Sequence, residues 1–347
     1  MTGYPRSSNV REDLESSLPG QTGRSLEVLN SLEKFVAENI NHLLKSVDEN
    51  WQPSSILPNL SSEKWTQAIQ EFRDSAARLT DELLVVLVGD MVTEEALPSY
   101  QTWLNNLAGI NDQTGNESHA WGRWIRGWTA EENRHGDLLN RYLYLCGRVD
   151  MHAVETTVQY LIKNGFNPGT ENDPYLGFIY TSFQERATKI SHRNVAILAS
   201  KAGDNHLRDI CGVIAGDEAR HEKAYKLFMR RIFEIDPVGA VLSFAKMMKK
   251  TVTMPAKLME DGMSSNLFGH FSIVAQRLGV YTVHDYASII DNLVRSWNVT
   301  HLTGLNGASA EAQDYVCGLS KRYEKLAERL TPPAIKRKFS WIFNREV

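Results

Sequence analysis

The sequence is poor in cysteine and contains no long apolar run. Its three cysteines, Cys146, Cys211 and Cys317, lie far apart in a chain of 347 residues and form no CxxC pair. This pattern argues against a disulfide framework and against a cysteine-ligated zinc or iron–sulfur site, and it fits a reducing compartment. The longest apolar run, 83–88, has six residues, whereas a membrane-spanning helix needs about 20. The sequence therefore excludes a membrane-spanning enzyme.

An excess of positive charge is also missing. The 38 Lys and Arg residues stand against 42 Asp and Glu residues, and the net charge of -4 argues against a protein that binds nucleic acid. The first 24 residues are polar and lack the apolar stretch of a secretory signal, and the acids Glu12, Asp13 and Glu15 are atypical of a transit peptide. We expect residues 1–24 to be a flexible N-terminal segment, with any transit peptide absent or removed.

Alternating strand patterns are scarce, and helical periodicity dominates from Ser25 onward. The spacing of apolar residues predicts four long helices, near 81–108, 118–147, 174–203 and 205–234. Shorter helices are expected near 25–44, 62–79, 238–250, 266–278, 282–298 and 309–330, and a short extended tail near 339–343. Pro98 predicts a bend in the first long helix. We expect residues 25–347 to form a single all-α domain, with a four-helix bundle core and additional surrounding helices.

The second and fourth long helices carry the same pattern, acid-acid-x-Arg-His, at 131–135 and 217–221. A glutamate and a histidine three positions apart share one face of a helix. Each helix therefore presents one carboxylate together with one imidazole. If the two faces meet, they supply half of a site for two hard or borderline cations.

The other half of such a site is expected from one glutamate on each remaining long helix, as in ferritin-like di-iron bundles. Glu94 and Glu185 are the candidates, and they lie 91 residues apart, close to the 86 residues between the two histidines. The complete candidate set is Glu94, Glu132, His135, Glu185, Glu218 and His221. Four carboxylates and two imidazoles can hold two ferrous ions and leave positions open for oxygen.

A single Glu-x-x-His pair on a helix is usually part of a solvated face. Duplication argues against that interpretation here, as does the apolar surrounding: Trp128 precedes Glu132 by four positions, and Ile214 precedes Glu218 by four. Zinc hydrolysis is disfavoured because there is no HExxH motif. The neighbouring acids at 95 and 131 are turned about 100° off the shared face, so we expect second-layer or surface positions for them.

Several stretches resemble the soluble plant acyl-[acyl-carrier-protein] desaturases, the stearoyl carrier protein desaturase family. They are LVGDMVTEEALPSYQTWLN (87–105), WTAEENRHGDLLNRYLYLCGRVDM (128–151), TENDPYLGFIYTSFQERATKISH (170–192) and GDEARHEKAY (216–225). The similarity extends from about residue 27 to the C-terminus. It implies a homodimeric helical enzyme with two Fe²⁺ per chain, located in the plastid (chloroplast) stroma.

The resemblance also implies the reaction, which is O₂-dependent desaturation of a saturated acyl chain held as a thioester on acyl carrier protein. Reduced ferredoxin is the implied electron donor, and stearoyl with a double bond between carbons 9 and 10 is the implied substrate and product. The family's metal ligands fall on the same six positions. In the family pattern Glu132 and Glu218 bridge the irons, Glu94 and His135 complete one iron, and Glu185 and His221 complete the other.

Three further positions carry over from the family. Trp51 matches a tryptophan proposed to pass electrons through Asp217 and His135, although it could equally be a packed residue in a turn. Asp217 would orient a ligand imidazole. Thr188 matches a threonine beside the oxygen site, or it bonds its own helix backbone.

Residues 219–257 contain nine Lys or Arg residues and three acids, a local charge of +6. This stretch either receives the acidic carrier protein or is an ordinary solvated surface. The aromatic residues at 103, 121, 124 and 178 are expected in the core more often than along an acyl tunnel. Two alternatives remain for the whole chain: another ferritin-like di-iron oxidase, or a non-catalytic iron-binding or carrier-binding paralogue.

Overall fold

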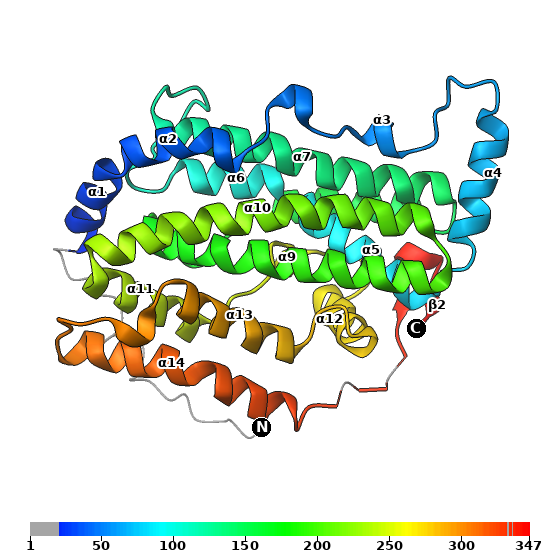
Figure 1. Cartoon of the computed structure of the whole chain (residues 1–347). Coiled ribbons are helices and arrows are strands. Elements are labelled where there is room, and N and C mark those ends of the chain that lie inside the picture. The colour runs from blue at the N-terminus through cyan, green and yellow to red at the C-terminus, as the bar shows by residue number, and fades with distance from the viewer. Residues whose placement is uncertain (1–20, 332, 335) are drawn as a thin grey trace, which may run out of the picture.

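The computed structural model describes residues 21–331, 333–334 and 336–347, which form an array of packed α-helices (Figure 1). The α-helices are α1 (Gln21–Ser31), α2 (Glu33–Leu43), α3 (Pro53–Ile56), α4 (Trp65–Ala76), α5 (Asp81–Glu94), α6 (Leu97–Asn105), α7 (Ala120–Cys146), α8 (Met151–Asn164), α9 (Pro174–Ala202), α10 (Asn205–Ile235), α11 (Pro237–Lys250), α12 (Leu267–Leu278), α13 (Val283–Ser296) and α14 (Gly307–Ala327). Four short 3-10 helices, η1 (Val47–Glu49), η2 (Pro255–Leu258), η3 (Val299–His301) and η4 (Ser340–Ile342), and the antiparallel pair β1 (Lys338–Phe339) and β2 (Arg345–Glu346) complete the described elements.

Local chemistry fixes the ends of the long helices. The Asp173 carboxylate accepts a hydrogen bond from the Leu176 amide at the start of α9, and Asp204 accepts one from the Leu207 amide at the start of α10. Such caps satisfy amides that have no partner in the first helical turn. Gly203 follows α9 with a φ of 84°, which glycine adopts at little cost. The short connection makes α9 and α10 an antiparallel pair (Figure 1).

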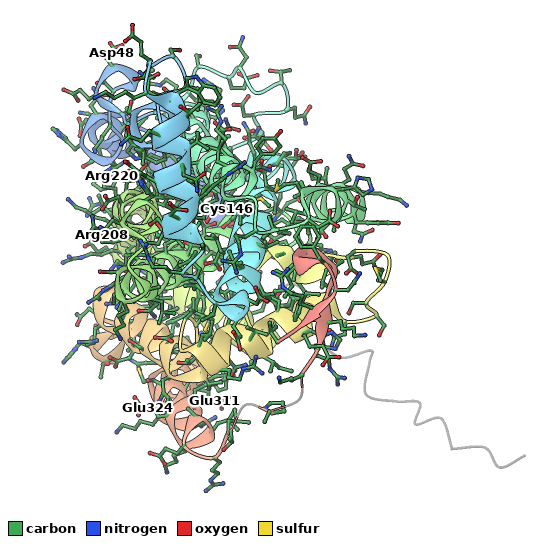
Figure 2. All side chains as sticks on the ribbon, turned by 90° about the vertical axis from the view of Figure 1, so that its right-hand side faces the viewer. Asp48, Cys146, Arg208, Arg220, Glu311 and Glu324 are labelled. Atoms are coloured by element: carbon green, nitrogen blue, oxygen red, sulfur yellow. The ribbon has the colours of Figure 1, made fainter. Side chains whose placement is uncertain are left out.

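The four helices α5, α7, α9 and α10 pack against one another and form the centre of the molecule. Helices α2 and α6 lie along α7, whereas α11, α13 and α14 lie on the other side of α9 and α10 (Figure 1). In the view turned by 90°, Asp48 on η1 and Glu324 on α14 mark opposite edges of the molecule (Figure 2). The prediction of a four-helix bundle with additional surrounding helices is confirmed. Within the described residues, no helix combines the length and apolar composition needed to cross a membrane.

The first long helix is broken in two. The sequence pattern predicts one bent helix over 81–108, but α5 ends at Glu94 and α6 begins at Leu97. Pro98 has no amide hydrogen, and its ring would collide with the carbonyl four residues earlier, which belongs to Glu94. The bend at Pro98 is therefore confirmed, but the continuous helix is wrong, and Glu94 is left in the last turn of α5.

The ends of the chain also differ from expectation. Helix α1 begins at Gln21, so the expected flexible segment 1–24 overlaps a helix, and residues 1–20 lie outside the described part of the chain. The apolar stripe over 25–44 is divided between α1 and α2. At the other end, η4 interrupts the expected extended tail between β1 and β2. Helix α8 was not predicted, although the Asp150 side chain caps its start and Gly165 follows its end.

Two apolar clusters fill the interior, one toward each end of the bundle. On α7 the first cluster includes buried residues between 120 and 128, and the second includes residues between 138 and 146. On α10 the clusters include residues between 224 and 233 and between 207 and 214. The two acid-acid-x-Arg-His motifs lie between these clusters. The fold therefore places a layer of buried polar groups at the middle of the bundle.

Candidate metal centre

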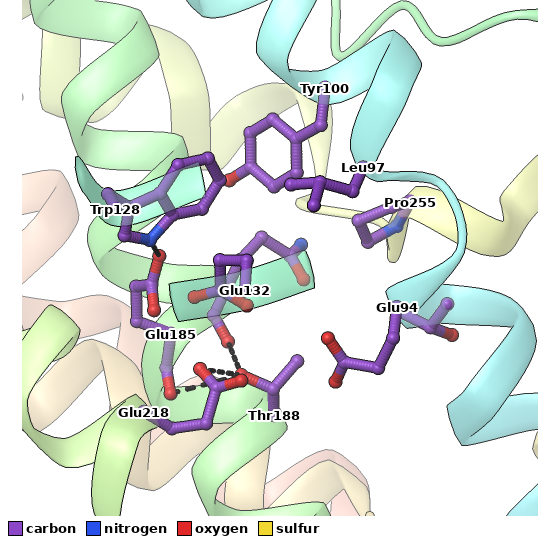
Figure 3. Close-up of a pocket in the computed structure, with 11 residues that line it drawn as sticks. Glu94, Leu97, Tyr100, Trp128, Glu132, Glu185, Thr188, Glu218 and Pro255 are labelled. Carbon is purple, nitrogen blue, oxygen red and sulfur yellow. Dashed lines mark hydrogen bonds between the residues drawn. The ribbon is translucent and has the colours of Figure 1, made fainter. Parts of the chain in front are cut away.

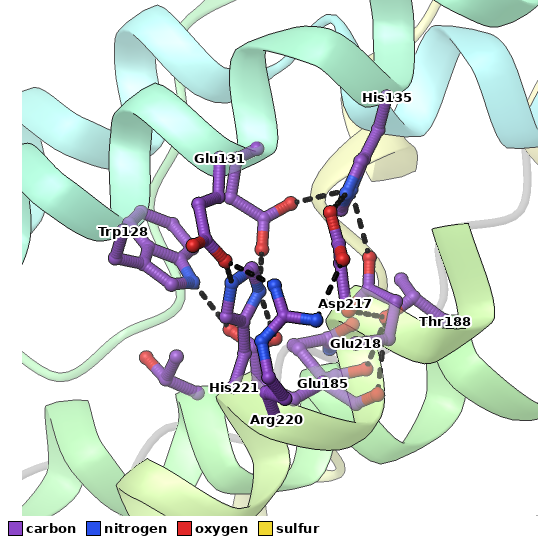
Figure 4. Close-up of polar contacts among 12 residues, drawn as sticks. Trp128, Glu131, His135, Glu185, Thr188, Asp217, Glu218, Arg220 and His221 are labelled. Atoms are coloured by element: carbon purple, nitrogen blue, oxygen red, sulfur yellow. Dashed lines mark hydrogen bonds and ion pairs between the residues drawn. The ribbon is translucent and has the colours of Figure 1, made fainter. Parts of the chain in front are cut away.

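Four helices bring six carboxylate and imidazole side chains together in this middle layer (Figure 3, Figure 4). Helix α5 contributes Glu94, α7 contributes Glu132 and His135, α9 contributes Glu185, and α10 contributes Glu218 and His221. Their side chains are only 0% to 7% exposed. All six residues selected from the sequence therefore meet in one buried cluster.

Two carboxylates are shared between the halves of the cluster. One group consists of Glu94, Glu132, His135 and Glu218, and the other consists of Glu132, Glu185, Glu218 and His221, each with ligand atoms within 4.8 Å of one another. Glu132 Oε2 lies 3.0 Å from His135 Nδ1, whereas its Oε1 lies 2.5 Å from His221 Nδ1. Glu132 thus faces both imidazoles with different oxygens, an arrangement that suits a ligand bridging two cations.

The donor atoms of the cluster fit two divalent cations. Among the described residues, five buried atoms of the cluster form no hydrogen bond with acceptable angles, although some of them lie close together: Glu132 Oε1, His135 Nδ1, Glu185 Oε2, Glu218 Oε1 and His221 Nδ1. Buried polar atoms without partners are costly. Two divalent cations would engage these atoms and balance the charge of four carboxylates. Mixed carboxylate and imidazole ligands suit iron and related transition metals.

Protonation of the cluster opposes metal binding. Burial alone would lower the pKa of His135 and of His221, but the Glu132 carboxylate raises both pKa values well above the usual range. Burial raises the pKa of Glu185 well above its usual value, and it also raises the pKa of Glu218. Because ligands must be deprotonated, metal binding should release protons and strengthen as pH rises.

Each histidine of the cluster contacts an acid from the opposite helix. His135 Nε2 lies 3.4 Å from Asp217 Oδ2, and His221 Nε2 lies 2.8 Å from Glu131 Oε2 (Figure 4). Burial alone would raise the pKa of both acids, but hydrogen bonding to the histidines lowers the pKa of each to about 2. Such carboxylates fix the orientation and tautomer of a ligand imidazole. Glu131 is therefore a partner of the cluster and not a surface group.

The arginines of the two motifs bind these acids. Arg134 Nη2 donates to Asp217 Oδ2 at 2.8 Å, and Arg220 Nη2 donates to Glu131 Oε2 at 2.6 Å. The four fixed positions of the repeated motif thus all contribute to a single network in both copies. The expectation that Arg220 belongs to a basic surface stretch is wrong, because its guanidinium is engaged here.

Trp51 joins the same network from the loop before α3. Its indole N–H donates to Asp217 Oδ2 at 3.1 Å, and its ring lies parallel to the His135 ring with centroids 6.1 Å apart. The Arg134 guanidinium covers the indole at 4.1 Å from its centroid. The half-buried Trp51 therefore connects the protein surface with His135 through Asp217.

Thr188 contacts both the metal cluster and the backbone of its own helix, the two roles expected from the sequence. Its hydroxyl lies 2.7 Å from Glu218 Oε2, and it also lies 3.1 Å from the Gln184 carbonyl of its own helix (Figure 3). Glu95, the remaining acid beside the candidate set, is half-buried and lines a separate crevice with Glu94. Thr188 therefore contacts the cluster, whereas Glu95 borders it.

Two cavities adjoin the cluster and share Thr93 in their walls. The smaller one, about 30 Å³, lies among the carboxylates and is closed by Leu97, Tyr100 and Pro255 (Figure 3). The larger one, about 280 Å³, is mainly apolar, and its walls come from α5, α9, α12, α13, α14 and the loop 251–254. An apolar chain thus has a space beside the buried polar layer.

The large aromatic residues considered for a tunnel lie elsewhere. Trp121, Trp124 and Phe178 are buried in the apolar cluster toward one end of the bundle. Trp103 is half-buried, and its indole N–H donates to Thr170 Oγ1 at 2.8 Å. None of these four side chains lines either cavity within the described structure, so the expectation that they belong mainly to the core is confirmed.

The fold and the buried cluster define a ferritin-like helical bundle with a candidate two-metal carboxylate centre. The chain belongs to the fatty acid desaturase family, whose family model matches residues 24–343.

The comparisons with individual proteins agree with this membership. The chain is 54% identical to stearoyl-[acyl-carrier-protein] 9-desaturase of Simmondsia chinensis, over 99% of this chain and 86% of that protein. It is also 54% identical to palmitoyl-[acyl-carrier-protein] 4-desaturase 3 of Ophrys sphegodes, over 97% of this chain and 85% of that protein. The solved structure of DesA2 from Mycobacterium tuberculosis shares the fold, with a TM-score of 0.52 and 16% identity over 82% of this chain and 99% of that one.

Proposed function

We propose that this chain is an acyl-[acyl-carrier-protein] desaturase of fatty acid biosynthesis, with two ferrous ions held by the six clustered side chains. The observation that carries the proposal is the pair of overlapping ligand groups, in which Glu132 and Glu218 are common to both. Two iron ions bound there would supply the means to activate molecular oxygen. The named relatives, which act on acyl chains carried by acyl carrier protein, support the substrate class.

The surroundings of the cluster suit a saturated acyl chain. The carbons that react in such a chain have no polar group nearby, so shape and depth of a cavity must position them. The larger cavity offers apolar side chains such as Phe183, Phe271 and Tyr286, and it shares Thr93 with the cavity among the carboxylates. Thr188 and Glu218 would then border the reacting part of the chain.

Electrons must come from outside the chain, since its three cysteines are single free thiols that cannot form an iron–sulfur cluster. We propose reduced ferredoxin as the donor, with Trp51, Asp217 and His135 as the route inward. The contacts of 3.1 Å and 3.4 Å along this route support the assignment. Turnover with substrate and oxygen but without any added reductant would contradict it.

The basic stretch supplies a candidate dock for the carrier protein. Seven of its nine cations are exposed: Lys223, Arg230, Arg231, Lys246, Lys249, Lys250 and Lys257. Arg220 and Lys226 instead pair with buried acids. Lys249, Lys250 and Lys257 flank the loop 251–254, which lines the larger cavity. An acidic carrier bound there would present its acyl chain to that cavity.

The remaining proposals follow the relatives. Their chloroplastic names support a plastid location, and we propose that the chain acts as a homodimer on stearoyl-carrier protein with formation of a 9,10 double bond. The palmitoyl 4-desaturase is equally similar to this chain, so palmitoyl-carrier protein and a double bond at carbon 4 are the alternative substrate and product to test.

The experiment that tests the site is metal analysis of purified protein after iron-replete expression. We expect two irons per chain. A content of one zinc and no iron would contradict the assignment of the cluster. Two irons without desaturation of any acyl thioester would favour a different di-iron oxidase or a non-catalytic paralogue.

A further inference from the structure

The two carboxylates at the outer ends of the cluster are each held by a ring N–H from a neighbouring side chain. Glu185 Oε1 accepts a hydrogen bond from the Trp128 indole at 3.0 Å (Figure 3). Glu94 Oε1 lies 2.8 Å from His192 Nε2. An ionised carboxylate can only accept hydrogen bonds, so His192 Nε2 is the donor in this pair.

The two contacts have the same arrangement around the cluster. In each carboxylate one oxygen is taken by the ring donor, and the other faces a histidine of the cluster. Glu94 Oε2 lies 3.8 Å from His135 Nδ1, and Glu185 Oε2 lies 3.6 Å from His221 Nδ1. The ring donors therefore leave one oxygen of each outer carboxylate directed at the place where a cation would bind.

His192 lies in a buried setting between α5, α9 and α10. Its side chain is 1% exposed and lies on α9, seven positions after Glu185. The neighbouring Ser191 hydroxyl lies 3.0 Å and 2.9 Å from the two carboxylate oxygens of Asp90, which precedes Glu94 by one helical turn on α5. Cys211 of α10 also interacts with the imidazole. The Ser191–Asp90 contacts tie α5 to α9 at the level of Glu94, beside the position that carries the ring.

We propose that His192 and Trp128 are a matched pair of positioning residues, each orienting the outer carboxylate of one metal position. The inference rests on the proposed two-metal function. Neither residue belongs to the six candidate ligands, and each acts through Glu94 or Glu185. Because a different donor serves each position, the two positions can be weakened one at a time.

The test measures metal binding to the full-length protein and does not depend on catalysis. Co²⁺ and Fe²⁺ are titrated anaerobically against a competing chelator for the wild type, for three single variants and for the double variant His192→Phe with Trp128→Phe. His192→Phe removes the donor at Glu94 but keeps a ring, His192→Gln keeps a side-chain N–H, and Trp128→Phe removes the donor at Glu185. Circular dichroism and thermal unfolding of the metal-free proteins report the integrity of the fold.

We expect the wild type to bind two ions and His192→Phe to bind one of them normally and the other about 10- to 100-fold more weakly. Trp128→Phe should weaken one ion similarly, the double variant should weaken both, and His192→Gln should recover most of the loss. If the metal-free Phe variant does not fold, His192→Asn takes its place, because its amide is too short to reach Glu94 as Gln does.

Two unchanged affinities in a folded His192→Phe or His192→Asn variant would overturn the inference. A His192→Gln variant as weak as the variant without the donor would also overturn it. Failure of the wild type to bind two ions would instead contradict the proposed function, so the two failures are distinguishable.

Discussion

At the residue scale, the cluster depends on a few side chains that serve two partners at once. His221 is such a residue, since its Nδ1 faces Glu132 and its Nε2 contacts Glu131. We expect His221→Ala to bind at most one metal ion tightly and to lose desaturation. His284→Ala, which changes an exposed histidine on α13, should keep both. Metal analysis together with an activity assay checks this, and two tightly bound ions in His221→Ala would contradict the ligand assignment.

Asp90 provides a prediction about pH. Burial raises the pKa of Asp90 to about 6 from an ordinary value near 3.8. The native state therefore binds this proton more tightly than the unfolded state, and the metal-free protein should lose stability from Asp90 as pH rises from about 4 to about 6. Asp90→Asn cannot lose a proton. Its unfolding free energy relative to that of the wild type should therefore increase by about 2–3 kcal/mol when the pH is raised from 4 to 7.5.

Urea unfolding of metal-free wild type and of Asp90→Asn at these two pH values measures that gain. Buried acids without a direct interaction with Asp90, such as Glu185, contribute equally to both proteins, so the difference reports Asp90 together with its neighbours His192 and Glu94. A difference in unfolding free energy that is the same at both pH values would show that Asp90 is already ionised at low pH in the folded protein.

The sequence was sufficient to identify the six clustered side chains. Helical spacing selected the two Glu-x-x-His pairs, and the ligand pattern of ferritin-like bundles pointed to Glu94 and Glu185. The sequence was insufficient for their partners. The contacts of Glu131, Trp128 and His192 cross between helices, and the pairs lie 57 to 98 residues apart in sequence. For Glu131 a signal was present, because it occupies the same motif position as Asp217. For His192 no comparable repeat exists.

At the element scale, the close approach of α12 to α5 shapes the larger cavity. A Cβ on Gly89 of α5 would lie 2.2 Å from the Phe271 ring of α12, and Phe271 is part of the cavity wall. Gly89→Ala must displace that ring, and we expect it to destabilise the protein by about 1–3 kcal/mol. Gly212→Ala on α10 is the control, because a Cβ there meets no atom within 4 Å.

Removal of a helical glycine at such an open position should leave stability unchanged or raise it by about 0.5–1 kcal/mol. Chemical denaturation measures both variants. Equal stabilities for Gly89→Ala and Gly212→Ala would show that α12 is not packed against α5 as described.

Most elements follow from local chemistry, and the exceptions have local causes. The bend at Pro98 could be inferred from the missing amide hydrogen, but its consequence, the separation of α5 from α6 beyond Glu94, required the structure. Helix α8 was overlooked although its signals are local, since Asp150 caps its start and Gly165 follows its end.

At the scale of the whole molecule, the exposed cations and the larger cavity are the basis of the proposed carrier dock. Charge reversal by Lys249→Glu with Lys257→Glu changes cations that flank the cavity-lining loop 251–254. We expect a several-fold higher KM for the acyl-carrier substrate, a smaller salt dependence of KM, and unchanged metal content. Arg230→Glu with Arg231→Glu is the matched comparison farther along α10.

Steady-state kinetics at two salt concentrations distinguishes these pairs. An unchanged KM in the Lys249 and Lys257 variant would leave this region as an ordinary solvated surface. A larger effect from the Arg230 and Arg231 pair would move the dock away from the loop and toward the end of α10.

The most direct measurement of the central claim is the location of any double bond made by the iron-loaded protein. Stearoyl- and palmitoyl-carrier protein are incubated with reduced ferredoxin and oxygen, and the acyl products are analysed by mass spectrometry. We expect a double bond between carbons 9 and 10 of the stearoyl chain, with stearoyl preferred. A 4,5 double bond in the palmitoyl chain would retain the reaction but contradict the proposed substrate. The absence of a double bond in every acyl chain, with two irons bound, would contradict the account.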